Sequence, residues 1–168
     1  MKIYLVGLAV LALMFGMVLL SSATEKSNDL ILGISTDKES YAKGDPVYCT
    51  LMLVNVGTQP IVVNKRLAIN RDALFPHEVL FYVTGPEGKL LNFIPMVTVS
   101  IYPKLEEFTT LYPSRFVRRT LELSEFFSLE KEGKYTIQAV YENYYEPAGM
   151  MVWQGKIASN KVEIEVRR

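Results

Sequence analysis

The chain has 168 residues, about the length of one globular domain, and 49% of them are hydrophobic, so it can bury one core without a metal or disulfide. Its 18 basic and 18 acidic residues balance, which argues against a nucleic-acid partner, because such a partner attracts concentrated positive charge. The short basic clusters Lys65-Arg66 and Arg118-Arg119 are predicted to be solvated.

Cys49 is the sole cysteine, which excludes an intrachain disulfide and a four-cysteine metal site. Because Cys49 lies in an alternating apolar run, its thiol is predicted to be buried.

A long apolar segment opens the chain. Residues 3–20 are uninterrupted by charge and follow Lys2, and the small residues Ser21 and Ala23 fit a signal-peptidase site. A stretch of about 18 apolar residues can also span a bilayer as a helix. Residues 1–23 are therefore predicted to be a signal peptide or an N-terminal membrane anchor, with cleavage after Ala23 favoured. Residues 24–29 are a polar linker, and the positive charge before the segment predicts that the body, residues 30–168, lies outside the cytoplasm.

The body shows the period-two hydrophobic pattern of β-strands. Strands are predicted over residues 30–34, 47–54, 61–63, 79–84, 89–93, 116–123, 135–141 and 161–166. The second of these places Val47, Cys49, Leu51 and Leu53 on its inner face. Strands 79–84 and 89–93 are predicted to pair as a hairpin, and the last strand has the half-buried pattern of a sheet edge. Helical signals after residue 24 are limited to one turn in residues 124–129. The pattern predicts an all-β, antiparallel two-sheet sandwich of about seven to eight strands, preceded by an N-terminal hydrophobic helix.

Three stretches resemble the extracellular immunoglobulin-like domains of bacteria and archaea. Residues 35–47 contain Tyr-Ala-Lys-Gly-Asp-Pro-Val, and the strand that follows ends in Asn-Val-Gly at residues 55–57. Residues 133–141 resemble the tyrosine corner of these domains, in which Tyr135 would lock the corner through its hydroxyl. Residues 153–162 resemble the start of the last strand. The resemblance implies an immunoglobulin-like β-sandwich of unassigned function and carries no catalytic residue across. The sequence departs from the family pattern at Ser114, where Pro-Gly is usual, and in the long insert 100–113.

Few residues offer catalytic or ligand-binding chemistry. His77 is the sole histidine, lies in a turn-like segment and has no nucleophile motif near it. No phosphate-binding glycine motif occurs. The acidic pairs Glu106-Glu107 and Glu130 with Glu132 are predicted to be solvated surface rather than a glycosidase or calcium site. The chain is therefore expected to be no enzyme and to have no cofactor or metal.

One aromatic and methionine-rich segment, residues 141–153, stands out for binding, because such side chains make good contact surface. Its candidate protein-contact residues are Tyr144, Tyr145, Met150 and Trp153. The alternative is that Tyr141, Val152 and Trp153 simply cover the open end of the core. A second candidate is the loop 102–113, which contains Phe108, Leu111 and Tyr112, and its alternative is a structural flap.

These patterns predict a non-enzymatic interaction module outside the cytoplasm, secreted or anchored to the membrane by its N-terminal segment. Its expected partner is another envelope or extracellular protein, or a glycan as a lesser candidate. Contact with the membrane is expected only through residues 3–20, if this segment stays uncleaved. Two alternatives stay open: a structural accessory domain of the cell envelope with no ligand, and a peptidase-inhibitor module.

Overall fold

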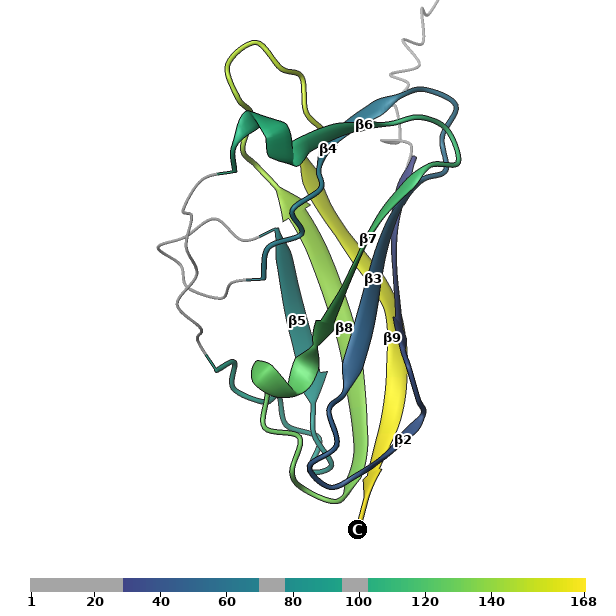
Figure 1. Ribbon diagram of the computed structural model, residues 1–168, viewed down its shortest axis with the longest axis vertical. Helices are drawn as coiled ribbons and strands as arrows, with labels where there is room; N and C mark the ends of the chain where they lie inside the picture. Colours follow the sequence, from purple (N-terminus) through teal and green to yellow (C-terminus); the bar gives the residue numbers. More distant parts are fainter. Residues whose placement is uncertain (1–28, 70–77, 95–102) are drawn as a thin grey trace, which may run out of the picture.

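The computed structural model describes residues 29–69, 78–94 and 103–168, and nearly all of its regular structure is β-strand (Figure 1). Within these ranges no helix is long and apolar enough to cross a membrane. The predicted N-terminal hydrophobic helix lies outside the described residues, and so does His77. The elements are β1 (Leu30–Thr36), β2 (Ser40–Ala42), β3 (Tyr48–Asn55), β4 (Ile61–Asn64), β5 (Val79–Thr84), η1 (Leu105–Glu107), β6 (Phe108–Leu111), β7 (Phe116–Glu122), η2 (Leu123–Glu125), β8 (Gly133–Asn143) and β9 (Gly155–Arg167), where η marks a 3-10 helix.

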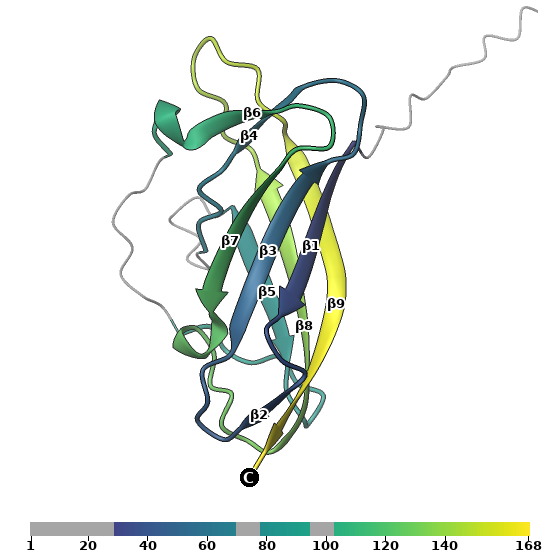
Figure 2. The ribbon, with the colours of Figure 1, turned by 45° about the vertical axis from the view of Figure 1, so that its right-hand side comes forward.

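Two sheets lie face to face and enclose the core (Figures 1 and 2). One has the order β1-β3-β7, and the other has the order β2-β9-β8-β5. A separate two-stranded ribbon, β4-β6, crosses the upper end in Figure 1. Sheets of three and four strands packed in this way form an immunoglobulin-like sandwich. The all-β sandwich predicted from the hydrophobic period is thus confirmed for the described residues, which form nine strands where about seven to eight were predicted.

The predicted inner face of β3 is buried. Cys49, Leu51 and Leu53 are each 0% exposed, and they alternate with residues that face outward. Because side chains on a strand point to opposite faces in turn, a period-two apolar pattern is enough to bury every second residue. Burial also raises the pKa of the Cys49 thiol to about 12, so this cysteine is a packing residue and no nucleophile.

The chain changes sheets between β1 and β2. β1 pairs with β3, whereas β2 pairs with β9 in a parallel register, so the sandwich is not wholly antiparallel as predicted. The Tyr41 hydroxyl fastens this crossing: it donates to Asp37 Oδ1 at 2.7 Å and accepts from the Lys38 backbone N–H at 3.1 Å. Burial and the bond to Asp37 raise the pKa of Tyr41 to about 12. Near its C-terminal end β9 therefore lies between β2 and β8. The prediction that this segment is an edge strand is wrong there.

Two predicted pairings differ in the structure. Residues 89–93 form no strand: only the bridge between Thr84 and Leu90 and a few turn hydrogen bonds join them to β5, and the long partner of β5 is β8. The insert 100–113, whose strand order the sequence left open, supplies η1 and β6, and β6 pairs with β4. Hydrophobic alternation reports which face of a strand is buried, but it does not report which strand lies beside it.

The tyrosine corner implied by the family resemblance is present. The Tyr135 hydroxyl donates to the Lys131 carbonyl at 2.7 Å, four residues upstream, and the ring is 1% exposed. Desolvation of the buried ring raises the pKa of Tyr135 above its usual value. The bond ties the turn after η2 to the start of β8, which is the role that the corner has in immunoglobulin-like domains.

Candidate functional site

Three loops gather at one end of the sandwich, where the described part of the chain begins (Figure 2). They are residues 56–60, 112–115 and 144–154, and together they are called the loop end. The opposite end consists of residues 37–39, 43–47, 85–89 and 126–132, and is called the far end. Because β1 runs from the loop end to the far end, the chain enters the sandwich at the loop end.

Asn55, the last residue of β3, holds the loop end together. Its side chain is 0% exposed, and its Nδ2 donates to the carbonyls of Gln59 at 2.8 Å and Leu111 at 2.7 Å. Its Oδ1 accepts from the Gly57 backbone N–H at 2.9 Å. The Asn-Val-Gly string noted in the sequence is thus a buried clamp that joins two loops.

Gly57 lets the N-terminal end of the described chain approach this clamp. The Asp29 carbonyl accepts hydrogen bonds from the backbone N–H groups of Val56 at 2.7 Å and Gly57 at 3.1 Å. A Cβ on Gly57 would lie 2.5 Å from the Asp29 Cβ, a distance that real Cβ atoms essentially never show. Asp29, the first described residue, is therefore held beside the loop 56–60.

Ser114 occupies a backbone position that suits glycine. Its φ is 64°, in the left-handed region, and its N–H donates to the Asn55 carbonyl at 2.9 Å. The departure from Pro-Gly noted in the sequence is therefore a change of residue and not of backbone shape. A side chain at such a φ costs about 1–2 kcal/mol.

We expect Ser114→Gly to raise the free energy of unfolding by about 0.5–1 kcal/mol, because the strain that it relieves exceeds the entropy that glycine adds to the unfolded chain. Urea denaturation followed by circular dichroism measures the change. Ser128→Gly is the matched control, because Ser128 is exposed and its φ is not positive. A gain at Ser128 equal to that at Ser114 would contradict the explanation.

Asn143, at the base of the long loop 144–154, joins the two ends of this loop. The buried Asn143 side chain donates from Nδ2 to the carbonyls of Tyr145 at 3.1 Å and Trp153 at 2.8 Å, so it joins the two ends of the loop. A turn at the tip links the Met150 N–H to the Pro147 carbonyl at 3.1 Å, and Gly149 supplies the positive φ of 79° that the turn needs.

The four predicted contact residues lie in different surroundings. Tyr144 is 68% exposed, but Trp153 is half-buried on the core, with its ring centre 5.7 Å from that of Tyr141. Tyr145 and Met150 are also half-buried, and the Tyr145 ring stacks on Phe108 with 6.3 Å between centres. The alternative reading, that part of this segment covers the core, therefore applies to Trp153.

Met151 is the most exposed large hydrophobic side chain of this end, at 88%, and sequence reasoning did not single it out. Its neighbour Val152 is 8% exposed. The sequence shows two adjacent methionines and no period across them, so only the path of the loop decides which one faces solvent.

The second candidate loop divides in the same way. Phe108 and Leu111, at the two ends of β6, are 8% and 3% exposed: Leu111 belongs to the hydrophobic core, and Phe108 is covered by the Tyr145 ring. Tyr112, the next residue, is 61% exposed and belongs to the loop end. Val56 and Phe116, both 52% exposed, lie at the same end.

Charge is distributed very unevenly between the two ends. The 20 residues of the loop end include two charged residues, Glu146 and Arg115, whereas the 20 residues of the far end include ten. Exposed apolar groups crowd the end that has few charges. A surface of this kind can be desolvated at little electrostatic cost, which is the property of a contact surface.

A buried polar cluster that the sequence did not predict lies below the β4-β6 ribbon. Glu78 is 3% exposed, and its Oε1 accepts from Asn64 Nδ2 and Arg66 Nε, each at 3.0 Å. Its Oε2 accepts from the backbone N–H of Ala68. The Arg66 side chain is 14% exposed, so its prediction as a solvated residue is wrong. Since every acceptor position of the carboxylate is engaged with the protein, the cluster fixes the segment 64–68 and offers no free catalytic group.

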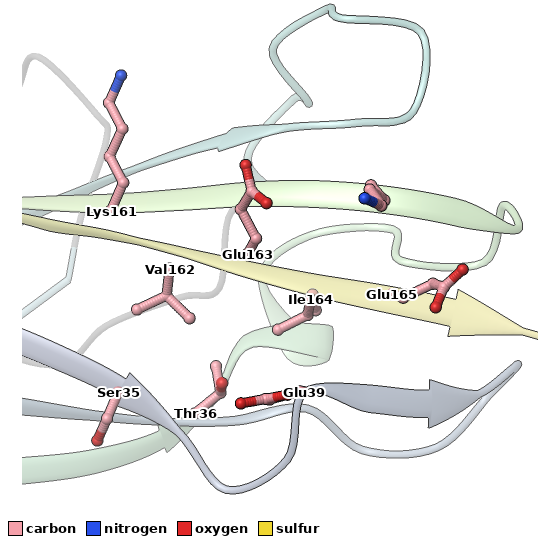
Figure 3. Close-up of a pocket in the computed structure, with 9 residues that line it drawn as sticks. Ser35, Thr36, Glu39, Lys161, Val162, Glu163, Ile164 and Glu165 are labelled. Atoms are coloured by element: carbon pink, nitrogen blue, oxygen red, sulfur yellow. The ribbon is translucent and has the colours of Figure 1, made fainter.

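An open groove of about 550 Å³ separates β1 from β9 (Figure 3). The Val162 and Ile164 side chains lie on its β9 side and point toward β1, and Glu39 lies across the groove from them, whereas the Glu163 side chain points away from β1. Farther along the same seam, the Asn160 side chain bridges the strands: it donates to the Ile34 carbonyl at 3.0 Å and accepts from the Ile34 N–H at 2.9 Å. In the described ranges no group of three or more metal-ligating side chains occurs, in this groove or elsewhere.

Solved structures similar to the chain include two that match more than four fifths of its length. No protein-family model matches it, and no curated protein matches it. A solved CARDB domain from Pyrococcus furiosus, in complex with di-metal ions, is 14% identical over 83% of this chain and 88% of that domain, with a TM-score of 0.42. Native alpha-2-macroglobulin from Escherichia coli, solved from domain MG7 to its C-terminus, is 22% identical over 82% of this chain, with a TM-score of 0.39. The chain matches 16% of that macroglobulin structure.

Proposed function

We propose that the chain is a non-enzymatic interaction module that works outside the cytoplasm and makes its contact through the loop end. The observation that carries this proposal is the pairing of exposed apolar side chains, Tyr112, Tyr144 and Met151 above all, with a near absence of charge at this end. Tyrosine supplies a large contact area for a small loss of side-chain entropy. Methionine is flexible and adapts its shape to the surface that it contacts.

The loop end also has the stiffness that a contact surface needs. The Asn55 clamp joins two of its loops, and Asn143 closes the third, while the Trp153 backbone N–H donates to the Val62 carbonyl at 2.8 Å in β4. Because these groups are already ordered, binding loses less conformational entropy than it would with free loops. The exposed tips Tyr144 and Met151 are therefore presented on a fixed base.

Photo-crosslinking in the cells that make the protein tests the proposal. We expect a photoreactive residue placed at Met151 of the full chain to form an adduct, because a partner would exclude water there. The matched control is Leu90, which is 56% exposed but lies next to the charged far end. Adding Tyr112→Ser and Tyr144→Ser should reduce the adduct at position 151, while leaving the melting temperature nearly unchanged, because exposed substitutions cost about 0.5 kcal/mol or less.

Equal labelling at positions 151 and 90, or no adduct at either, would contradict the proposal. It would favour the alternative of an accessory domain that spaces other parts of the envelope and has no contact surface of its own. A large drop in melting temperature with the serine variants would instead show that Tyr112 and Tyr144 stabilise the fold.

A further inference from the structure

We infer that the partner of the loop end is the outer surface of the lipid bilayer in which residues 3–20 are anchored, so that the sandwich stands on the membrane with Met151, Tyr144 and Tyr112 in the headgroup region. This inference rests on the proposed function, because it names the partner of the same surface. It also takes the membrane-anchor alternative for residues 1–23.

The reach of the linker favours this orientation. Eight residues, 21–28, separate the apolar segment from Asp29, and eight residues span roughly 28 Å at full extension. Asp29 is hydrogen-bonded to Val56 and Gly57, so the chain leaves the sandwich at the loop end. The loop end is therefore held within about 28 Å of the bilayer surface whatever the conformation of the linker.

The far end cannot take its place. The 13 residues of β9 run the length of the sandwich and correspond to about 40 Å at the usual rise of a strand. To bring the far end onto the membrane, the linker would have to cover this length, which exceeds its roughly 28 Å. Half of the residues of the far end are also charged, and burying charges in an apolar layer is costly.

The chemistry of the loop end suits the headgroup region. Tyrosine rings are amphipathic and concentrate at membrane interfaces, and Tyr112 and Tyr144 are 61% and 68% exposed. Arg115 is exposed beside Tyr112, where it would meet lipid phosphate. The acidic residue of this end, Glu146, accepts a hydrogen bond from Gln154 Nε2 at 2.6 Å, which offsets part of the cost of bringing its charge near the lipid.

Depth-dependent quenching in vesicles tests the inference on the full chain. The chain is made by cell-free synthesis, so that residues 1–23 are kept, and inserted into vesicles of phosphatidylcholine and phosphatidylglycerol. Met151→Cys carries an environment-sensitive dye, and Leu90→Cys carries the same dye as the control. The native Cys49 is 0% exposed and stays unlabelled in the folded protein.

With lipids brominated near the glycerol end of their acyl chains, we expect the dye at position 151 to shift to shorter wavelength and to lose much of its emission, and the dye at position 90 to do neither. Tyr112→Ser with Tyr144→Ser should weaken the quenching at 151. Equal emission at the two positions would overturn the inference. So would isolation of the native chain with its N-terminus at residue 24, because the tether would then be missing.

The crosslinking experiment separates this inference from the proposed function. An adduct at position 151 with the mass of a lipid supports both. A protein adduct at 151, without quenching in vesicles, keeps the contact module and overturns the membrane as its partner. No adduct and no quenching would overturn both.

Discussion

Replacing Glu78 with alanine is expected to lower the free energy of unfolding by about 3–5 kcal/mol, the usual cost of removing one partner of a buried ion pair. The Glu78 carboxylate accepts hydrogen bonds from Asn64, Arg66 and Ala68, and Arg66 is 14% exposed. Without the carboxylate, the guanidinium loses its bidentate partner, and Glu107 Oε2 remains 3.7 Å from its Nη1. A buried charge and two buried donors then lose their main acceptor.

Urea denaturation of the Glu78→Ala chain measures this loss, and Glu125→Ala is the control, because Glu125 is an exposed residue of the short helix η2. A double-mutant cycle with Arg66→Met tests the cause. The coupling energy between Glu78 and Arg66 is expected to exceed about 1 kcal/mol, as for residues that share one buried network. Additive losses would show that the pair does not act as a unit.

Replacing Asn55 with aspartate is expected to destabilise the fold by more than about 3 kcal/mol at neutral pH, because unsatisfied buried groups cost about 1–3 kcal/mol each and charged ones cost more. The change is nearly isosteric, but a carboxylate cannot donate to the carbonyls of Gln59 and Leu111, as Asn55 Nδ2 does. It would place a negative charge against two carbonyl oxygens at a position that is 0% exposed.

The loss in Asn55→Asp should depend on pH. Burial and the facing carbonyls disfavour the ionised form, so the folded-state pKa of the introduced carboxyl lies above the unfolded value of about 3.9. A raised folded pKa means that stability is greatest below the unfolded pKa and falls as the pH rises through the folded pKa. The difference from the native chain is therefore expected to be larger at pH 7 than at pH 4.5.

Chemical denaturation at the two pH values checks this expectation, with Asn92→Asp as the control at an exposed position. A loss at Asn55 that does not vary with pH would argue that the side chain acts by shape alone. A loss no larger than that of the control would remove Asn55 from the role of clamp.

Much of the fold follows from local patterns in the chain. The alternation around Cys49, Leu51 and Leu53 predicted which residues of β3 are buried, and each of the three is 0% exposed. The tyrosine corner at Tyr135 was identified by its neighbours in the sequence, and its hydrogen bond spans only four residues. Features set by a short period or a short loop are visible in the sequence because their partners are near in the chain.

The candidate site was located only in part. Residues 141–153 were identified by composition, which reports the kind of side chain but not its exposure. The structure exposes Tyr144 and Met151 and turns Trp153 onto the core, since Asn143 and Val62 hold the end of the loop in place. Two of the three loops at this end are joined by the bond from Asn55 to Leu111, 56 residues away.

The amino-acid order by itself thus determined the sandwich class, the inner faces of its long strands and the apolar segment that precedes them. Only the tertiary structure decided the partner of each strand, the parallel pairing of β2 with β9, and the burial of Arg66 against Glu78. The physical reason is one of range: hydrophobic periodicity acts between neighbours in the chain, whereas strand partners and buried ion pairs join residues that meet only after folding.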